Sequence, residues 1–273
     1  MMKKINDIIG DAKTIGIAGH VRPDGDCMGS CMSLYNYLKK NRPDLDVRVF
    51  LEFVDKKFNI IENTDQIITT GYDGTKFDLF ISLDTASLDR LGLNLPFYEN
   101  AKRTACIDHH ASNDGYADYN YILPKASSAS EVLYDLLDED LIDKSIAEPM
   151  YMGIAHDSGV FRFQSTTPKT MRIAANMIEK GVNVNMILEE TFFRKTYNQM
   201  MVTAKIQSEA VLALDGKCIY GYCTSEMMEE YGVTTKDLDA VVASIRNVDG
   251  VEVAMFLYQL SENSYKVSLR SKN

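Results

Sequence analysis

The chain has 273 residues, of which 45% are hydrophobic and 25% are charged, so it is long enough for a sizeable core and for two domains of unequal size. Its net charge of −10 argues against a protein that grips long duplex nucleic acid or an anionic membrane through a broad basic face. It has no apolar run of membrane-spanning length, no apolar signal core and no disulfide spacing among its five cysteines, which predicts a soluble cytoplasmic protein.

The first part of the chain alternates short apolar runs with amphipathic segments. The runs predicted to be strands are residues 14–18, 47–51, 77–83 and 103–107. The segments predicted to be helices are residues 26–40, 127–138, 144–155 and 168–180. This alternation predicts an α/β fold, in which helices cover both faces of a parallel sheet.

The second part of the chain has a different order of elements. Residues 183–201 are predicted to form a helical connector with Asn183 or Asn185 as its N-cap. The elements predicted beyond it are strands at 211–214 and 218–222 around an Asp-Gly turn, a helix at 235–247, and strands at 251–260 and 265–269. We therefore predict a first domain over residues 1–185, a helical linker over 186–205, and a smaller α+β domain with an antiparallel-leaning sheet over 206–273.

All four histidines of the chain lie beside aspartates. They occur in Gly-His-Val-Arg-Pro-Asp-Gly-Asp (19–26), Ile-Asp-His-His (107–110) and His-Asp-Ser-Gly (156–159), and a further acid, Asp84, closes the apolar run 77–83. Pro23 and Gly25 are helix breakers, so His20, Asp24 and Asp26 are expected on a loop. Because the carboxyl ends of parallel strands line a common crevice, we expect these side chains to meet there.

So many imidazoles and carboxylates exceed the needs of one tetrahedral site, and carboxylates clustered without cations would repel one another. Oxygen-rich ligation with some imidazole favours two Mn²⁺ ions, with Mg²⁺ as the alternative. Two such ions roughly 3.5–4 Å apart polarise phosphoryl oxygens and activate water. We interpret Cys27 and Cys31 as buried helix residues, with a zinc clip that includes His20 as the alternative.

The histidine and aspartate motifs together resemble the DHH phosphoesterase superfamily, and within it the nanoRNase/pAp-phosphatase branch of the NrnA type. The matching segments are residues 19–30, 83–86, 107–113 and 153–163. The second domain resembles the DHHA1 domain with which such enzymes hold the substrate. The resemblance implies hydrolysis of short single-stranded oligoribonucleotides to mononucleotides, with 3′-phosphoadenosine 5′-phosphate as a further small nucleotide substrate.

The resemblance also implies six metal ligands. These are His20 and Asp24 for one ion, Asp26, His109 and Asp157 for the other, and Asp84 for both. His156 is expected only to shape the turn around Asp157. The site is expected in the cleft between the two domains.

The remaining implied roles are catalytic or substrate-binding. His110 would act on the substrate phosphate, and Asp108 would orient it. Arg162 is expected to contact a substrate phosphate or else to be a solvated arginine, and Arg270 and Ser271 match a substrate-binding segment of the second domain. Residues 127–131 are predicted to cap a helix whose N-terminus offers another place for a phosphate.

Relatives continue into a Gly-rich loop that ends in histidine, whereas this sequence ends at Ser271-Lys272-Asn273. We therefore expect either a truncated second domain or an incomplete substrate clamp. The alternative functions are a cyclic-dinucleotide or pApA phosphodiesterase, a manganese inorganic pyrophosphatase, a RecJ-like exonuclease and a weakened nucleotide-binding module. The resemblance further suggests a homodimer.

Overall fold

The structure, a computed structural model, describes residues 4–238 and 241–271 and divides between Phe193 and Arg194 into two compact units. Residues 239 and 240 of the predicted helix 235–247 lie outside the described residues, as do Lys272 and Asn273 at the end of the predicted second domain. The domain and linker boundaries drawn from the sequence stay predictions. Each unit is described below by itself.

The first unit is built on a five-stranded parallel sheet with the strand order β2-β1-β3-β4-β5. Its strands are β1 (Thr14–Ala18), β2 (Asp46–Phe50), β3 (Leu79–Leu83), β4 (Thr104–Asp108) and β5 (Tyr119–Ile122). Strands β3 and β4 are buried along their whole length, as expected for apolar runs inside a parallel sheet. The sequence had not predicted β5, because this edge strand alternates polar and aromatic residues and stays partly exposed.

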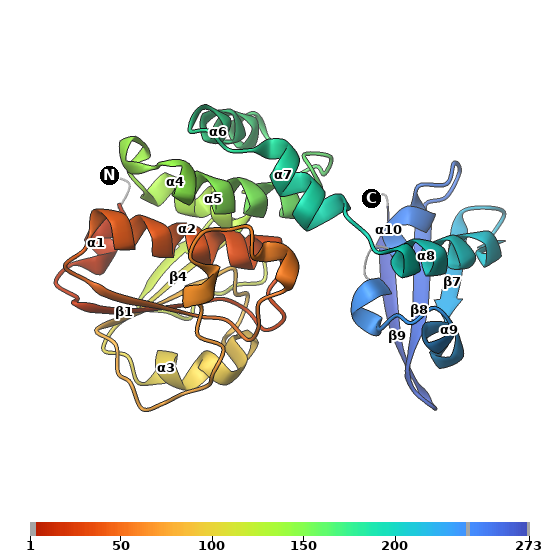
Figure 1. The fold of residues 1–273 in the computed structure, drawn as a ribbon, viewed down its shortest axis with the longest axis horizontal. Helices are drawn as coiled ribbons and strands as arrows, with labels where there is room; N and C mark the ends of the chain where they lie inside the picture. Colours follow the sequence, from red (N-terminus) through yellow and green to blue (C-terminus); the bar gives the residue numbers. More distant parts are fainter. Residues whose placement is uncertain (1–3, 239–240, 272–273) are drawn as a thin grey trace. The chain divides into compact units, whose positions relative to one another are not determined.

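Helices lie on both faces of this sheet (Figure 1), which confirms the predicted α/β fold class. One face is covered by α1 (Ile5–Ile9), α2 (Gly25–Asn41), α4 (Ala129–Leu136) and α5 (Lys144–Asp157), and the other by α3 (Leu95–Glu99). An aromatic cluster of Phe50, Phe77, Phe80 and Phe97 fills the α3 side. The elements outside these layers are α6 (Pro168–Glu179), α7 (Val184–Leu188), the π-helix Glu189–Phe193, and the 3-10 turns Lys56–Phe58, Thr64–Gln66, Leu88–Asn94 and Glu139–Leu141.

Helices α2 and α5 pack with their main chains in contact at Gly29. A Cβ atom at this position would lie 2.4 Å from the carbonyl oxygen of Pro149 and 2.8 Å from the nitrogen of Gly153, both in α5. Because these are backbone atoms, a larger residue would push the two helices apart. The close crossing places the first turn of α2 against the C-terminal half of α5.

The segment 183–201, predicted as a helical connector, holds more than one helix, with a break before Tyr197. Asn183 caps α7 as predicted, by accepting a hydrogen bond from the nitrogen of Met186. A new helix, α8 (Tyr197–Glu209), then starts at Thr196, whose side chain and that of Gln199 form a reciprocal capping box. This capping box satisfies the free amides of a helix start, so the chain begins a second helix there.

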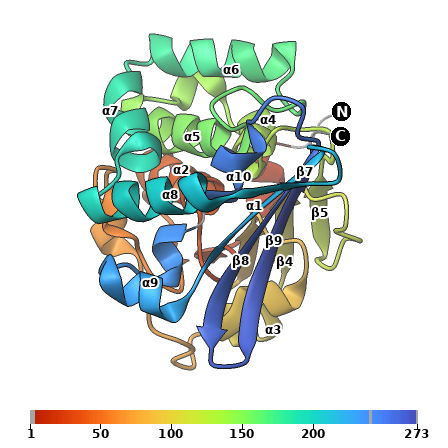
Figure 2. The same cartoon turned by 90° about the vertical axis from the view of Figure 1, so that its right-hand side faces the viewer.

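The second unit holds a four-stranded mixed sheet with the order β6-β7-β8-β9. Strands β7, β8 and β9 are labelled in Figure 2. Its elements are β6 (Val211–Ala213), β7 (Cys218–Cys223), α9 (Ser225–Glu230), the 3-10 turn Thr235–Leu238, α10 (Val241–Arg246), β8 (Val253–Ser261) and β9 (Ser264–Ser271). The predicted antiparallel pairing holds for β6–β7 and β8–β9, whereas β7 and β8 are parallel. Helices α8 and α10 pack on one face of the sheet around the buried Ala254 and Phe256.

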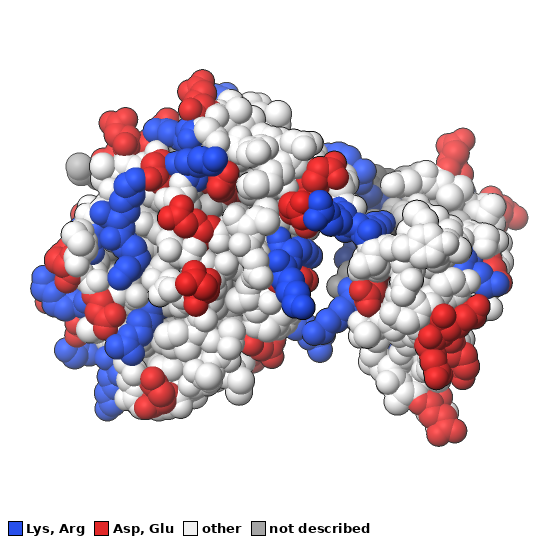
Figure 3. All heavy atoms as spheres, in the orientation of Figure 1, with Lys and Arg blue, Asp and Glu red and all other residues white. Residues whose placement is uncertain are grey.

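The charged side chains of the first unit are mixed on the face drawn in Figure 3, where Lys and Arg lie among Asp and Glu. In the second unit, acidic side chains gather over α9. Among the described residues, no helix combines the length and the apolar character needed to cross a bilayer.

Candidate metal centre

The first histidine motif lies between β1 and α2, and its structure corrects one prediction. His20 lies on the loop as expected, but Asp26 belongs to the first turn of α2. Asp24 is the N-cap, and its Oδ1 accepts hydrogen bonds from the nitrogens of Asp26 at 3.0 Å and Cys27 at 3.1 Å. A carboxylate N-cap supplies the partners that a helix start lacks, so the helix begins directly after Pro23-Asp24.

Asp84 follows the last residue of β3 and lies between two histidines. Its Oδ2 atom lies 3.4 Å from Nε2 of His20, and its Oδ1 atom lies 3.5 Å from Nε2 of His109. The side chain is 3% exposed, and its backbone has a left-handed φ of 52°. Backbone of this kind is uncommon outside glycine and is often found at functional sites. One buried carboxylate therefore offers one oxygen to each of two imidazole-containing clusters.

His109 is the centre of the second cluster. Its Nε2 atom lies 3.2 Å from Oδ2 of Asp157, the last residue of α5, and 4.0 Å from Oδ2 of Asp26. Both oxygens of Asp26 also accept backbone hydrogen bonds from the start of α4, at 2.6 Å from Ala129 and 3.0 Å from Ser130. The predicted alternative of a substrate phosphate at this helix start is therefore wrong, because the carboxylate of Asp26 already occupies the free amides.

The spacing of these atoms fits divalent cations. Around an ion with bonds of about 2.1 Å in octahedral geometry, neighbouring ligand atoms stand about 3 Å apart and opposite ones about 4.2 Å. The distances of 3.2, 3.4, 3.5, 3.7 and 4.0 Å between the candidate ligand atoms fall in that interval. The oxygen-rich donor set with imidazole suits Mn²⁺ or Mg²⁺. The residues brought together thus fit two ions that share Asp84.

The charges of the clustered side chains also favour the binding of cations. Burial alone would lower the pKa of His20, but hydrogen bonds to Asp24 and Asp84 raise it to about 12. Burial also opposes the protonation of His109, yet its carboxylate neighbours raise its pKa to about 10. Burial and the charge of Asp84 raise the pKa of Asp26 well above its usual range. Without cations, protons are therefore drawn into this site to neutralise the carboxylates.

His110, which lines the pocket, forms a pair with Asp108, and its Nδ1 atom also lies 3.7 Å from Oδ1 of Asp84. Nδ1 of His110 lies 2.8 Å from Oδ1 of the fully buried Asp108, whose Oδ2 accepts a 2.7 Å hydrogen bond from Nδ2 of Asn113. The hydrogen bond to Asp108 raises the pKa of His110 against the opposing effect of burial. Since Nδ1 donates to Asp108, Nε2 of this half-exposed imidazole is available to a ligand.

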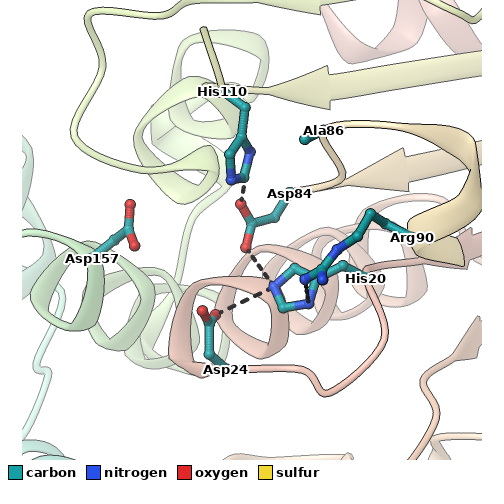
Figure 4. Close-up of a pocket in the computed structure, with 7 residues that line it drawn as sticks. All are labelled: His20, Asp24, Asp84, Ala86, Arg90, His110 and Asp157. Atoms are coloured by element: carbon teal, nitrogen blue, oxygen red, sulfur yellow. Dashed lines mark hydrogen bonds and ion pairs between the residues drawn. The ribbon is translucent and has the colours of Figure 1, made fainter. Parts of the chain in front are cut away.

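A cavity of about 260 Å³ opens between these groups (Figure 4). It is lined by His20, Asp24, Asp84, Ala86, Arg90, His110 and Asp157. Arg90, which the sequence analysis did not identify, lies in the 3-10 turn after β3, and its Nη2 atom is 3.4 Å from Nδ1 of His20. That Nδ1 atom lies 2.7 Å from the carbonyl oxygen of Val21 and donates to it, so Nε2 of His20 faces the carboxylates. Arg90 therefore places a cation on the wall of an otherwise acidic pocket.

Other residues singled out in the sequence lie elsewhere. Arg162 is exposed in the turn after α5 and does not line this cavity. Arg270 and Ser271 lie at the exposed end of β9 in the second unit, and their substrate roles stay predictions, as does that of Arg162. Cys27 and Cys31 are fully buried, as interpreted. The Cys27 thiol also lies in one group with His20 and Asp84, so the alternative of a thiol ligand stays open.

Residues 14–154 match the DHH family, N-terminal domain. The chain belongs to the DHH family. It is 31% identical over 94% of its length to the bifunctional oligoribonuclease and PAP phosphatase NrnA of Thermus thermophilus, covering 76% of that protein. It is 26% identical over 95% of its length to the protein of the same name from Bacillus subtilis, covering 82% of it.

A solved structure of an exopolyphosphatase-related protein from Bacteroides fragilis has the same fold. It matches 98% of this chain and 82% of its own chain with a TM-score of 0.89 at 22% identity. The protein is therefore a DHH phosphoesterase related at modest identity to NrnA enzymes, with a parallel-sheet domain followed by a smaller mixed-sheet domain.

Proposed function

We propose that this protein is a metal-dependent phosphodiesterase that hydrolyses short oligoribonucleotides to mononucleotides in the cytoplasm. The observation that carries the proposal is Asp84, one buried carboxylate whose two oxygens face His20 and His109 in separate clusters. The relatives from Bacillus subtilis and Thermus thermophilus are named as oligoribonucleases and PAP phosphatases, which favours these substrates. We propose 3′-phosphoadenosine 5′-phosphate as the second substrate.

The residues of the pocket take distinct roles in this proposal. The six candidate ligands are His20 and Asp24 for one ion, Asp26, His109 and Asp157 for the other, and Asp84 for both. When bound, two divalent ions, which we propose to be Mn²⁺, neutralise phosphate charge and activate water. His110, protonated through its contact with Asp108, donates a hydrogen bond or a proton to a phosphate oxygen or to the leaving oxygen. Arg90 pairs with a phosphate of the substrate.

The size and charge of the site favour short substrates. The cavity of about 260 Å³ is small for a nucleotide chain, and the net charge of −10 leaves little to attract further phosphates. Turnover with Mn²⁺ should be highest on RNAs of about two to five nucleotides and should fall steeply on longer RNA, with weak salt dependence. Digestion of a long RNA as fast as a dinucleotide would contradict the proposal and favour a RecJ-like exonuclease.

A substrate panel tests the reaction itself. Hydrolysis of a diribonucleotide, 3′-phosphoadenosine 5′-phosphate, pyrophosphate and a cyclic dinucleotide would be compared at saturating Mn²⁺. We expect the first two to be turned over. Preference for pyrophosphate or for the cyclic dinucleotide would identify the corresponding alternative function, and binding without turnover would identify a nucleotide-binding module. Size-exclusion chromatography with light scattering would test the predicted homodimer.

A further inference from the structure

His156 lies in the last turn of α5, next to the candidate ligand Asp157, but it belongs to none of the groups of candidate metal ligands found among the described residues. Its imidazole packs against Gly25, the residue between Asp24 and Asp26. A Cβ atom added to Gly25 would lie only 2.1 Å from Cγ and 2.4 Å from Nδ1 of His156. The ring therefore occupies the space in which any other residue at position 25 would place its side chain.

The opposite edge of the His156 ring is hydrogen-bonded to the π-helix. Nε2 of His156 lies 2.9 Å from Oγ1 of Thr191, and this hydroxyl donates to the carbonyl oxygen of Ile187 at 2.7 Å. Because the hydroxyl has only one proton, Nε2 of His156 must donate to it, which fixes the tautomer of the ring. Phe58 and Phe192 flank the imidazole, with ring centroids 5.9 and 5.3 Å away.

These contacts matter because Gly25 separates two candidate ligands. Gly25 is the first residue of α2, between the N-cap Asp24 and Asp26, and glycine has the greatest backbone freedom, so this helix start is less restrained at Gly25 than it would be with another residue. The His156 ring closes off that freedom from one side. Thr191 holds the ring from the other side, in a π-helical turn of the kind that is frequent at functional sites.

We propose that His156 is a positioning residue, which holds the Asp24–Asp26 turn and Asp157 in ion-binding geometry by packing on Gly25 and donating to Thr191. The inference rests on the proposed metal centre. Residues that orient metal ligands typically account for 10- to 100-fold in metal affinity when they are removed. His156 is thus assigned an effect on ion affinity without any contact to the ions.

The first test is the Mn²⁺ affinity of single variants, measured by calorimetry and by the loss of the free Mn²⁺ signal in electron paramagnetic resonance. His156→Ala should bind Mn²⁺ about 10- to 100-fold more weakly than wild type. Thr191→Val removes the acceptor with little change in shape and should show a smaller loss. His156→Gln restores a donor near the Nε2 position and should recover part of the affinity. The matched control is Ile154→Val, which trims a fully buried side chain of the same helix and should bind Mn²⁺ like wild type.

The second test is a double-mutant cycle between positions 25 and 156. Gly25→Ala should greatly weaken Mn²⁺ binding, because its Cβ meets the His156 ring, and Gly25→Ala combined with His156→Ala should bind better than Gly25→Ala alone. Thermal unfolding would establish that each variant is folded. If His156→Ala does not fold, the Mn²⁺ affinities of Thr191→Val and His156→Gln test the inference instead.

Wild-type affinity in His156→Ala, or an equal cost of Gly25→Ala in both backgrounds, would overturn this inference and leave the metal centre standing. Wild-type protein that binds no Mn²⁺ would overturn the proposed function, and the inference with it.

Discussion

Replacing Asp108 by asparagine should leave the metal content intact and still remove most of the turnover. In the structure, Oδ1 of Asp108 accepts from Nδ1 of His110, and its Oδ2 accepts from Nδ2 of Asn113. An asparagine at position 108 has only one side-chain acceptor, its amide oxygen, which will accept the hydrogen bond from Nδ2 of Asn113. The NH₂ group of the new asparagine will therefore face His110. Nδ1 of His110 must then become the acceptor, so the ring is neutral with its proton on Nε2, and a neutral imidazole is a far weaker acid than the imidazolium that Asp108 stabilises.

The expected size of the effect follows from the role of His110. A misplaced or missing acid–base group typically costs 10² to 10⁴ in rate, which corresponds to about 2.7 to 5.4 kcal/mol of activation free energy. The change also removes the negative charge that raises the pKa of His110. As pH rises, His110 will then lose its proton at a lower pH than in wild type. The fall of kcat with rising pH should therefore begin at a lower pH in Asp108→Asn.

The assay is kcat on a diribonucleotide at saturating Mn²⁺ across pH, together with metal analysis of the same samples. His110→Ala should match Asp108→Asn in kcat, and the double variant should be no worse than either, because both changes disable one unit. An unchanged kcat would refute the role of the pair. Loss of Mn²⁺ equal to that of His109→Ala would show that His110 is a ligand instead.

Other consequences of the site geometry are equally open to measurement. Asp84→Ala should lower the content of both ions and abolish activity, whereas Asp26→Ala should chiefly remove one ion, and full metal occupancy in Asp84→Ala would contradict the bridging role. Arg90→Ala should raise KM about tenfold or more, with partial recovery in Arg90→Lys, because it removes a charge-assisted hydrogen bond to a phosphate, and an unchanged KM would exclude that contact. Mn²⁺ binding at pH 7 should release protons, because His20 and His109 have pKa values raised to about 12 and 10, so affinity should weaken as pH falls. Calorimetry in buffers of different ionisation enthalpy would detect this release, and its absence would show that the ions do not displace the imidazole protons.

The parallel sheet was predictable because its strands are buried on both faces, and their apolar character is visible in runs such as 77–83. The meeting of His20, Asp84 and His109 was predictable for a related reason, since parallel strands end at one edge of the sheet. The edge strand β5 was not predictable in this way. It is half exposed and has no continuous apolar run.

Long-range features of the centre left no local pattern in the sequence. Asp26 is held by the start of α4, about a hundred residues further along the chain, and no spacing near Asp26 signals those two amides. Arg90 is one arginine in a polar turn, and only the fold brings it into the pocket. Its position after Asp84 in a turn that follows β3 was the single available sign.

The contact between α2 and α5 at Gly29 has a consequence for how freely this enzyme can be altered. At Gly29 the approach of the two helices is limited by main-chain atoms of α5 rather than by a side chain. A directed-evolution library aimed at new substrates therefore has room at wall positions such as Ala86 and Arg90, whereas variation at position 29 would disable nearly every member.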